Sequence, residues 1–280
     1  MEQSLEEFRN QNIVVTGGSR GIGKRIAMAF AATGARIGLV ARSKAELDLA
    51  KLEIEHAGGT ALHLRADVRD ADQIRGAIDR ARAHWGEIDA LICAAGIQGP
   101  IGPLAETAPQ SWAEPVLTNL IGVVNTCAAA LPGMMRRRRG KVIVLGGGGG
   151  AHARPNFSAY AASKAAVIRT VECMAAELLD YNVQVNVLGP GGAYTHMTDE
   201  ILRAGEKAGE REIADATQIR LTGGVTVQRQ TELAMFLASQ RSNHVSGKLV
   251  HVKDRWEQLA EMTVHPELYT LRRVLKVSRK

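Results

Sequence analysis

The stretch that decides the fold is Asn12–Gly34, "NIVVTGGSRGIGKRIAMAFAATG". It opens with a short β-branched apolar run, passes through a glycine-rich turn and continues with the periodicity of a helix. In an open α/β sheet such a turn binds phosphate, because glycines let the ligand approach the backbone and the helix N-terminus offers unpaired N–H groups. The stretch therefore predicts a strand, a phosphate-binding turn and a helix.

The same alternation continues along the chain. Six further apolar runs follow, separated by helical segments, at 36–41, 61–66, 88–96, 140–146, 183–190 and 247–252. Short, nearly continuous hydrophobic strands between helices predict a parallel sheet that is covered on both faces. We therefore expect a single α/β domain over residues 1–280, with a doubly wound Rossmann-type sheet of seven parallel strands.

Two segments depart from this rhythm. Residues 199–226 are charged and only weakly amphipathic, and an insertion of this kind between core elements predicts a lid over a substrate site. Residues 253–280 form a C-terminal extension that carries Trp256, Tyr269 and several leucines. This tail is too apolar for a disordered end, so we expect it to pack on its own or a neighbouring subunit.

The net charge of +6 raises the question of nucleic-acid binding. The basic residues are scattered, however, apart from Arg136–Arg139 at the end of a predicted helix, where the helix dipole favours positive charge. No nucleic-acid-binding motif accompanies this run. We expect no nucleic-acid partner.

The cellular location is predicted from the termini and the cysteines. The N-terminus, "MEQSLEEFRN", is unlike a signal or transit peptide, and no segment approaches the ~20 consecutive apolar residues that span a bilayer. Cys93, Cys127 and Cys173 lie in apolar segments without metal-site or disulfide spacing. We expect a cytoplasmic protein with buried free thiols, no metal and no membrane partner.

The end of the second predicted strand bears on the choice of cofactor. An acidic residue there would hydrogen-bond a ribose 2′-hydroxyl, but the sequence reads Ala41, Arg42 and Ser43. The planar fork of Arg42 suits a 2′-phosphate, and Arg20 in the glycine turn adds a second positive charge. The sequence favours NADP(H) over NAD(H).

Several motifs in order carry a family resemblance. They are Thr16, Gly17, Gly21 and Gly23 in the first turn, the pair Asp67–Val68, "CAAG" at Cys93–Gly96, Asn119 in "LTNLIGV", Tyr160 with Lys164, and "PGGAYT" at Pro190–Thr195. Over residues 10–252 the chain resembles the classical short-chain dehydrogenase/reductase (SDR) family. The "CAAG" motif departs from the family's Asn-Asn-Ala-Gly, because both asparagines are lost while the small residues are kept.

The resemblance implies a cofactor site. The residues that it assigns to cofactor binding are Gly17, Ser19, Arg20, Gly21, Ile22, Gly23, Arg42, Ser43, Asp67, Val68, Ala94, Ala95, Gly96, Tyr160, Lys164, Pro190, Gly191 and Thr195. Among them, Asp67 and Val68 are expected to contact the adenine and Thr195 the nicotinamide carboxamide.

The pair Tyr160 and Lys164 is the expected catalytic centre. Four residues apart on a helix, both side chains project from one face. A phenol with a reference pKa of ~10 is a poor acid or base at neutral pH, and a nearby ammonium and an oxidised nicotinamide lower that pKa. The resemblance implies that Tyr160 exchanges a proton with the substrate oxygen, Lys164 binds the ribose and Asn119 holds a water in a proton relay.

The family's remaining participant is absent. Counting thirteen residues back from Tyr160, where the family has a serine that hydrogen-bonds the substrate oxygen, gives Gly147 in a run of five glycines. Backbone N–H groups of this loop, a substrate hydroxyl, an ordered water or the side chain of His152 are the candidates for the missing hydrogen bond, and for His152 the sequence favours an exposed loop histidine over a substrate contact. Ser158 is expected to cap the helix that carries Tyr160.

Two hypotheses follow for the function. The first is an NADP(H)-dependent oxidoreductase that interconverts a ketone and a secondary alcohol on a small polar or sugar-like molecule. The alternative is a catalytically weak or inactive NADP-binding homologue that acts as a sensor or partner subunit. The resemblance also implies a homotetramer or homodimer that pairs through the helix near 110–131 and the helix carrying Tyr160.

Overall fold

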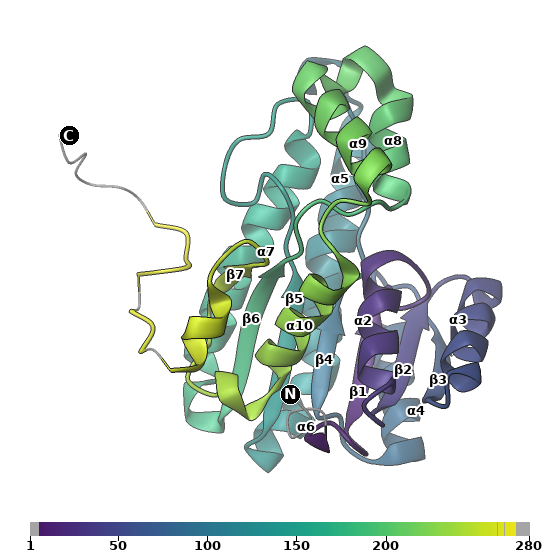
Figure 1. The fold of residues 1–280 in the computed structure, drawn as a ribbon, viewed down its shortest axis with the longest axis vertical. Coiled ribbons are helices and arrows are strands. Elements are labelled where there is room, and N and C mark those ends of the chain that lie inside the picture. Colours follow the sequence, from purple (N-terminus) through teal and green to yellow (C-terminus); the bar gives the residue numbers. More distant parts are fainter. Residues whose placement is uncertain (1–5, 262, 266, 273–280) are drawn as a thin grey trace.

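Seven parallel strands form one sheet in the order β3-β2-β1-β4-β5-β6-β7 (Figure 1). The computed structural model describes residues 6–261, 263–265 and 267–272. The strands are β1 Asn12–Thr16, β2 Arg36–Ala41, β3 Thr60–Arg65, β4 Ala90–Cys93, β5 Gly140–Leu145, β6 Val183–Gly189 and β7 Leu249–His251. The predicted α/β fold with a seven-stranded parallel sheet is confirmed.

Helices cover both faces of this sheet. They are α2 Gly21–Ala31, α3 Lys44–His56, α4 Ala71–Trp85, α5 Pro109–Pro115, α6 Gly122–Arg137, α7 Ser158–Glu177, α8 His196–Ala204, α9 Glu210–Thr222 and α10 Val227–Ala238. In β1, Ile13 and Val15 join the hydrophobic cluster that includes residues of α2, α3 and α10, whereas Val14 joins the cluster that includes residues of α4, α6 and α7. Because alternate residues of a strand face opposite ways, the continuous apolar run fills two cores.

The helix between β4 and β5 is longer than predicted. It does not stop near Leu131 but continues through Pro132 to Arg137, and Arg138 closes it in a left-handed conformation with φ of 53°. Proline removes one helical hydrogen bond. Packing against α4 keeps the helix intact, since Gly133 leaves room for Glu87 and Arg82, and the Arg82 guanidinium donates to the Ala130 carbonyl at 3.1 Å.

The stretch Pro109–Arg137 is also the one helix of the described residues that is long and apolar enough, by those two criteria alone, to cross a membrane. A helix that covers a sheet meets the same criteria. Here Thr126, Cys127 and Ala130 face the interior of the fold, in the layer formed with α4 and α7.

The cysteines are all free, but not all buried as predicted. Cys93 and Cys127 lie in the interior, whereas Cys173 is exposed. Cys173 occupies the face of α7 that points away from the sheet, where an apolar sequence context does not ensure burial.

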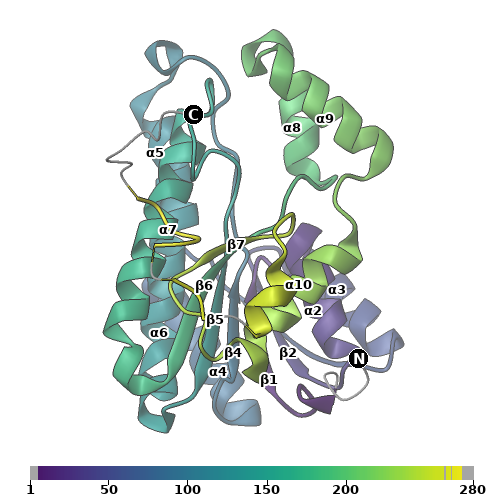
Figure 2. The ribbon, with the colours of Figure 1, turned by 60° about the vertical axis from the view of Figure 1, so that its left-hand side comes forward.

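The C-terminal extension packs on its own chain as far as it is described. Trp256 and Leu259 are 5% and 2% exposed, and the Trp256 ring lies 5.4 Å from that of Phe236. Further along, the Leu249 N–H donates to the Tyr269 carbonyl at 2.7 Å, and the segment runs along the edge of the sheet beside β7 (Figure 2). The part of the predicted extension at 273–280 lies outside the described residues.

Helices α8 and α9 occupy the segment expected to form the lid. Figure 2 shows them above the carboxyl ends of the strands, across from the upper ends of α5 and α7. A small apolar cluster includes Phe157 and Tyr160 on one side and Ile201, Ala208 and Ala216 on the other. The lid segment is therefore packed against the start of the helix that carries Tyr160.

Candidate active site

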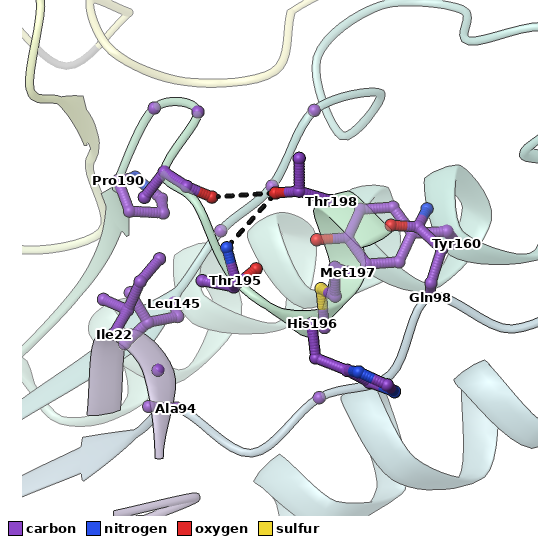
Figure 3. A pocket seen from close by; sticks show the side chains of 18 of the residues that line it. Ile22, Ala94, Gln98, Leu145, Tyr160, Pro190, Thr195, His196, Met197 and Thr198 are labelled. Atoms are coloured by element: carbon purple, nitrogen blue, oxygen red, sulfur yellow. Dashed lines mark hydrogen bonds between the residues drawn. The ribbon is translucent and has the colours of Figure 1, made fainter. Parts of the chain in front are cut away.

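A cleft runs along the carboxyl ends of the strands and brings the predicted site residues together. All of the predicted cofactor and substrate residues line it, from Gly17 to Thr195, and so do parts of α8 and α9. Figure 3 shows part of this cleft, with Ile22 and Ala94 at one end and Tyr160 and Gln98 at the other. Asn119 is the exception among the predicted residues, since it does not line the cleft and is fully buried.

The glycines of the first turn are required by close backbone approach. Gly17 has φ of +66°, and a Cβ there would lie 2.7 Å from the Ala95 backbone. A Cβ on Gly23 would lie 2.4 Å from the Gly17 carbonyl oxygen. Helix α2 begins directly after Arg20 with no side chain capping its N–H groups, so these donors are free to bind an anion.

The positive charge expected beside this turn is partly offset. Arg20 forms an ion pair with Glu46 at 3.4 Å, and the other Glu46 oxygen accepts a hydrogen bond from Ser19 at 3.0 Å. Arg42 lines the cleft and has no ion pair among the described residues. Ser43 caps α3, accepting from the Glu46 N–H at 3.3 Å. Glu46 was not predicted at this site, because it lies in α3 beyond the end of the strand and belongs to none of the motifs.

Asp67 also lines the cleft and is held there as a carboxylate. Burial disfavours its charge, but hydrogen bonds from the Arg69 backbone and side chain outweigh burial and keep the pKa of the Asp67 carboxyl below its usual value. Its neighbour Val68 is buried against Gly122 of α6. Both residues line the cleft, and their contact with an adenine stays a prediction.

The other end of the cofactor region is closed by the turn before α8. The Thr195 N–H donates to Thr198 Oγ1 at 3.2 Å, and that hydroxyl donates to the Ala193 carbonyl at 3.1 Å (Figure 3). Pro190 is fixed by Gln230, whose side-chain amide donates to its carbonyl at 2.9 Å. This network orients the "PGGAYT" segment toward the cleft.

Tyr160 and Lys164 lie together at the base of the cleft. They are 7% and 4% exposed, and Lys164 Nζ is 5.8 Å from the centroid of the tyrosine ring. Lys164 donates to the Leu145 carbonyl at 2.7 Å, and burial lowers its pKa to about 8. Burial also raises the pKa of the Tyr160 phenol, an effect that the charge of Arg154 opposes. Without a cofactor, the tyrosine is therefore a protonated donor at neutral pH.

Asn119 connects the loop after β4 to α7. It lies in a π-helical segment, Val116–Ile121, between α5 and α6. Its Oδ1 accepts from the Ile97 N–H at 2.9 Å, and its Nδ2 donates both to the Ile97 carbonyl at 3.1 Å and to Ser163 at 3.0 Å. Local π-helical turns occur frequently at functional sites. Here the turn places one amide between two walls of the site.

The glycine loop, residues 146–157 between β5 and α7, leaves room that the Tyr160 phenol fills. A Cβ on Gly147 would lie 2.3 Å from the Tyr160 hydroxyl oxygen and 2.9 Å from Cζ. A side chain at this position is therefore incompatible with the observed place of the phenol. His152 is exposed and lines the cleft, so it keeps both interpretations that the sequence allowed.

The expectation that Ser158 caps α7 is wrong. Phe157 occupies the N-cap position without a side-chain cap, and Ser158 is the first helical residue. Its hydroxyl instead accepts a hydrogen bond from the Trp112 indole N–H at 3.0 Å. The tryptophan comes from α5, a tertiary contact that the local sequence did not reveal.

The sequence also did not reveal an ion pair that connects the glycine loop to α9. Arg154 Nε and Nη2 donate to the two oxygens of Glu212 on α9 at 2.9 and 2.6 Å. Both side chains are largely buried, at 15% and 21% exposed. The Arg154 guanidinium also stacks 3.9 Å above the Phe157 ring. Among the described residues, no group of three or more His, Cys, Asp or Glu side chains is placed to hold a metal.

Comparison with known proteins gives a consistent result. Residues 11–206 match the family model for short chain dehydrogenases. The chain is 32% identical over 246 residues to the 3-oxoacyl-(acyl-carrier-protein) reductase FabG of Staphylococcus aureus strain Mu50, covering 86% of this chain and 96% of the relative. It is 30% identical over 237 residues to a 2,3-dihydro-2,3-dihydroxybenzoate dehydrogenase of Bacillus subtilis, covering 83% and 90%.

A solved structure of a dehydrogenase is also similar to this chain. A gluconate 5-dehydrogenase from Burkholderia cenocepacia, in complex with NADP and tartrate, superposes with a TM-score of 0.78 at 31% identity. The match covers 89% of this chain and 96% of that chain.

Proposed function

We propose that this chain, which belongs to the short-chain dehydrogenase family and is an NAD(P)-dependent oxidoreductase, depends on NADP(H). We further propose that it interconverts a ketone and a secondary alcohol on a small polar, sugar-like molecule. The observation that carries the proposal is the placement of Tyr160 and Lys164. Both are buried on α7 and line the same cleft as the glycine turn.

The protonation state of Tyr160 in the cofactor-free protein suits the proton donation that ketone reduction needs. A bound nicotinamide supplies or accepts the hydride. Because the pKa of Tyr160 is raised by burial, its phenol holds a proton at neutral pH and donates it to the substrate oxygen. Lys164 stays close enough to stabilise negative charge on the phenol after that transfer. Its hydrogen bond to Leu145 keeps the ammonium in place.

Two observations support NADP(H). Arg42 lines the cleft with no ion pair in the described part of the chain, so its guanidinium is available to a 2′-phosphate. The gluconate 5-dehydrogenase that superposes on this chain contains NADP. Glu46 is an observation against NADP(H), because its carboxylate pairs with Arg20 and partly neutralises the charge that would attract a 2′-phosphate. A 2′-phosphate would compete with Glu46 for Arg20, so we assign the preference chiefly to Arg42.

The substrate end supports a polar substrate. We propose that residues 199–226 are the substrate lid, with Arg154 and Glu212 holding it against the glycine loop. Arg154 and Glu212 both line the cleft, and a guanidinium and a carboxylate are groups that can hydrogen-bond substrate hydroxyls. The tartrate in the gluconate 5-dehydrogenase complex is a hydroxylated acid, and it is polar like the substrate that we propose.

We also propose a homodimer or homotetramer in the cytoplasm. Leu117, Ile121 and Val124 are 41%, 38% and 40% exposed at helical spacing, which forms an apolar stripe on the helix between β4 and β5. A second copy would cover this stripe and the adjoining face of α7. The free thiols fit a reducing compartment. Light scattering that gives only the monomer mass of 30.1 kDa at micromolar concentration would contradict the assembly.

The function is tested with the purified protein, NADPH and a panel of hydroxyketones, keto-sugars and keto-acids, by following the loss of reduced nicotinamide. We expect turnover with a subset of the polar ketones and a lower Kd for NADPH than for NADH. Tight NADPH binding without turnover of any ketone, or of any alcohol with NADP⁺, would favour the non-catalytic homologue. Equal Kd values for the two cofactors would overturn the cofactor assignment.

A further inference from the structure

One buried amide at the substrate end has no hydrogen-bond partner. The Gln98 side chain is 2% exposed, lines the cleft, and its Nε2 atom has no partner among the described residues. A buried amide that gives up water without gaining another bond is costly to the fold. An unpaired donor in a cleft therefore indicates a partner that arrives with a ligand.

The backbone around Gln98 is held on both sides. Before it, Asn119 binds both the N–H and the carbonyl of Ile97, at 2.9 and 3.1 Å. After it, Gly99 has φ of +73°, and a Cβ there would lie 2.2 Å from Pro115 Cγ. These contacts fix where the side chain leaves the loop, which is the condition for a preorganised binding group.

The same contacts connect Gln98 to the catalytic helix. Asn119 also donates to Ser163 Oγ at 3.0 Å, and Ser163 donates to the Tyr160 carbonyl at 2.7 Å. A Cβ on Gly96, two residues before Gln98, would lie 3.9 Å from Lys164 Nζ. Figure 3 accordingly shows Gln98 at the same end of the pocket as Tyr160.

Other side chains that could hold the reacting oxygen beside Tyr160 are absent, paired with another residue or exposed. Gly147 has no side chain, and Tyr160 occupies the space that one would need. Arg154 is already in a bidentate pair with Glu212. His152 lies on the exposed part of the loop. Gln98 is a buried side-chain donor at this end of the cleft whose Nε2 has no partner among the described residues.

We propose that the Gln98 carboxamide hydrogen-bonds the reacting oxygen of the substrate beside Tyr160, in the role that a hydroxyl at position 147 would otherwise have. The terminal torsion of a glutamine is broad, so the NH₂ group can turn into the cleft when the oxygen arrives. It then donates to the carbonyl oxygen as negative charge develops there, while Tyr160 delivers the proton. This inference rests on the proposed ketone reduction.

The test is Gln98→Met, which keeps the length of the side chain and removes its hydrogen bonds. We expect kcat to fall by ~10²-fold, the range for losing one donor to a developing oxyanion. The Kd for NADPH should stay within about twofold, and Tm should be unchanged or higher because the unpaired amide is gone. Gln228→Met, on an exposed part of α10, is the matched control and should change none of these values.

Binding provides a second readout. In Tyr160→Phe with NADPH bound, where turnover is lost, we expect the additional change Gln98→Met to weaken binding of the best ketone at least ~10-fold. Unchanged kcat and unchanged ketone affinity would overturn the assignment of Gln98 while leaving the proposed function intact. A wild-type protein that turns over no ketone and binds none would overturn both.

Discussion

The two ends of the cleft are built in different ways. At the cofactor end, backbone shape is decisive: Gly17 and Gly23 permit contacts that any side chain would block, and α2 begins with free N–H groups. At the substrate end, side chains from separate elements meet, with Arg154 from the glycine loop, Glu212 from α9 and Gln98 from the loop after β4.

This difference separates what family membership fixes from what makes this chain specific. A backbone cradle accepts one kind of ligand and leaves a short, recognisable motif. The substrate end is lined by side chains from three separate segments, so it has no short sequence motif. These side chains can be substituted without altering the backbone turn at the cofactor end. The loss of a side chain at Gly147 falls on the variable end, where Tyr160 has taken the space.

Lys164 is where the two ends meet, and its removal should have the largest effect. Lys164→Met should lower kcat/KM by ~10³-fold or more, because the phenol loses the charge that stabilises its deprotonated form. Steady-state kinetics with NADPH check this. Activity within tenfold of the wild type would show that Tyr160 works without the lysine.

The same variant reports on pH. In the cofactor-free protein, the Lys164 pKa is about 8, below its ordinary value of 10.5, so the unfolded state holds more protons between these two pH values. The lysine should therefore make stability rise with pH from about 8 to 10.5, and Lys164→Met should remove that part of the rise. Urea unfolding across this range measures it, and identical pH dependence in both proteins would contradict the lowered pKa.

Gly147→Ser should reduce turnover by ~10-fold or more, since the new Cβ would lie 2.3 Å from the Tyr160 hydroxyl and must displace it. Gly148→Ser is the matched control, because a Cβ there meets nothing within 4 Å. A higher rate for Gly147→Ser than for the wild type would show that Tyr160 moves without cost and that the family's serine site is still usable.

The sequence predicted the fold and the residues that line the cleft for physical reasons. Continuous apolar strands, glycines at close approaches and Tyr160 with Lys164 on one helix face are local patterns. Helix ends were predicted less accurately, since tertiary packing stabilises α6 beyond Pro132. Glu46, Glu212 and the partner of Ser158 could not be predicted, because each acts through a residue distant in sequence.

Arg42→Asp tests the cofactor end, because we assign the preference for NADPH chiefly to Arg42. We expect the Kd for NADPH to rise ~10–100-fold, with a much smaller change for NADH, because a bidentate phosphate contact is replaced by repulsion. Arg139→Asp, at an exposed position beyond α6, controls for net charge. Equal losses for both cofactors would place Arg42 away from the 2′-phosphate.

Glu46→Gln should act in the opposite direction on the same site. It releases Arg20 from its ion pair and should tighten NADPH binding a few-fold, whereas NADH binding should change little. Fluorescence titration of both cofactors gives the comparison. Weaker NADPH binding would show that Glu46 supports the site through Ser19.

The smallest expected effect concerns the lid. Glu212→Gln breaks the largely buried pair with Arg154 and should lower stability by about 2 kcal/mol, with a several-fold rise in KM for the ketone. Glu206→Gln, exposed at the turn before α9, is the control. A change in KM without any loss of stability would show that Glu212 binds substrate rather than holding the lid.

We propose that Tyr160 performs proton transfer in a working reductase despite the missing serine. The direct measurement is the single-turnover rate of ketone reduction by preformed NADPH complexes of the wild type, Tyr160→Phe and Tyr181→Phe, which removes a hydroxyl outside the cleft. We predict that Tyr160→Phe slows reduction by ~10³-fold with an unchanged Kd for NADPH, while Tyr181→Phe matches the wild type. Equal rates in all three proteins would contradict the account.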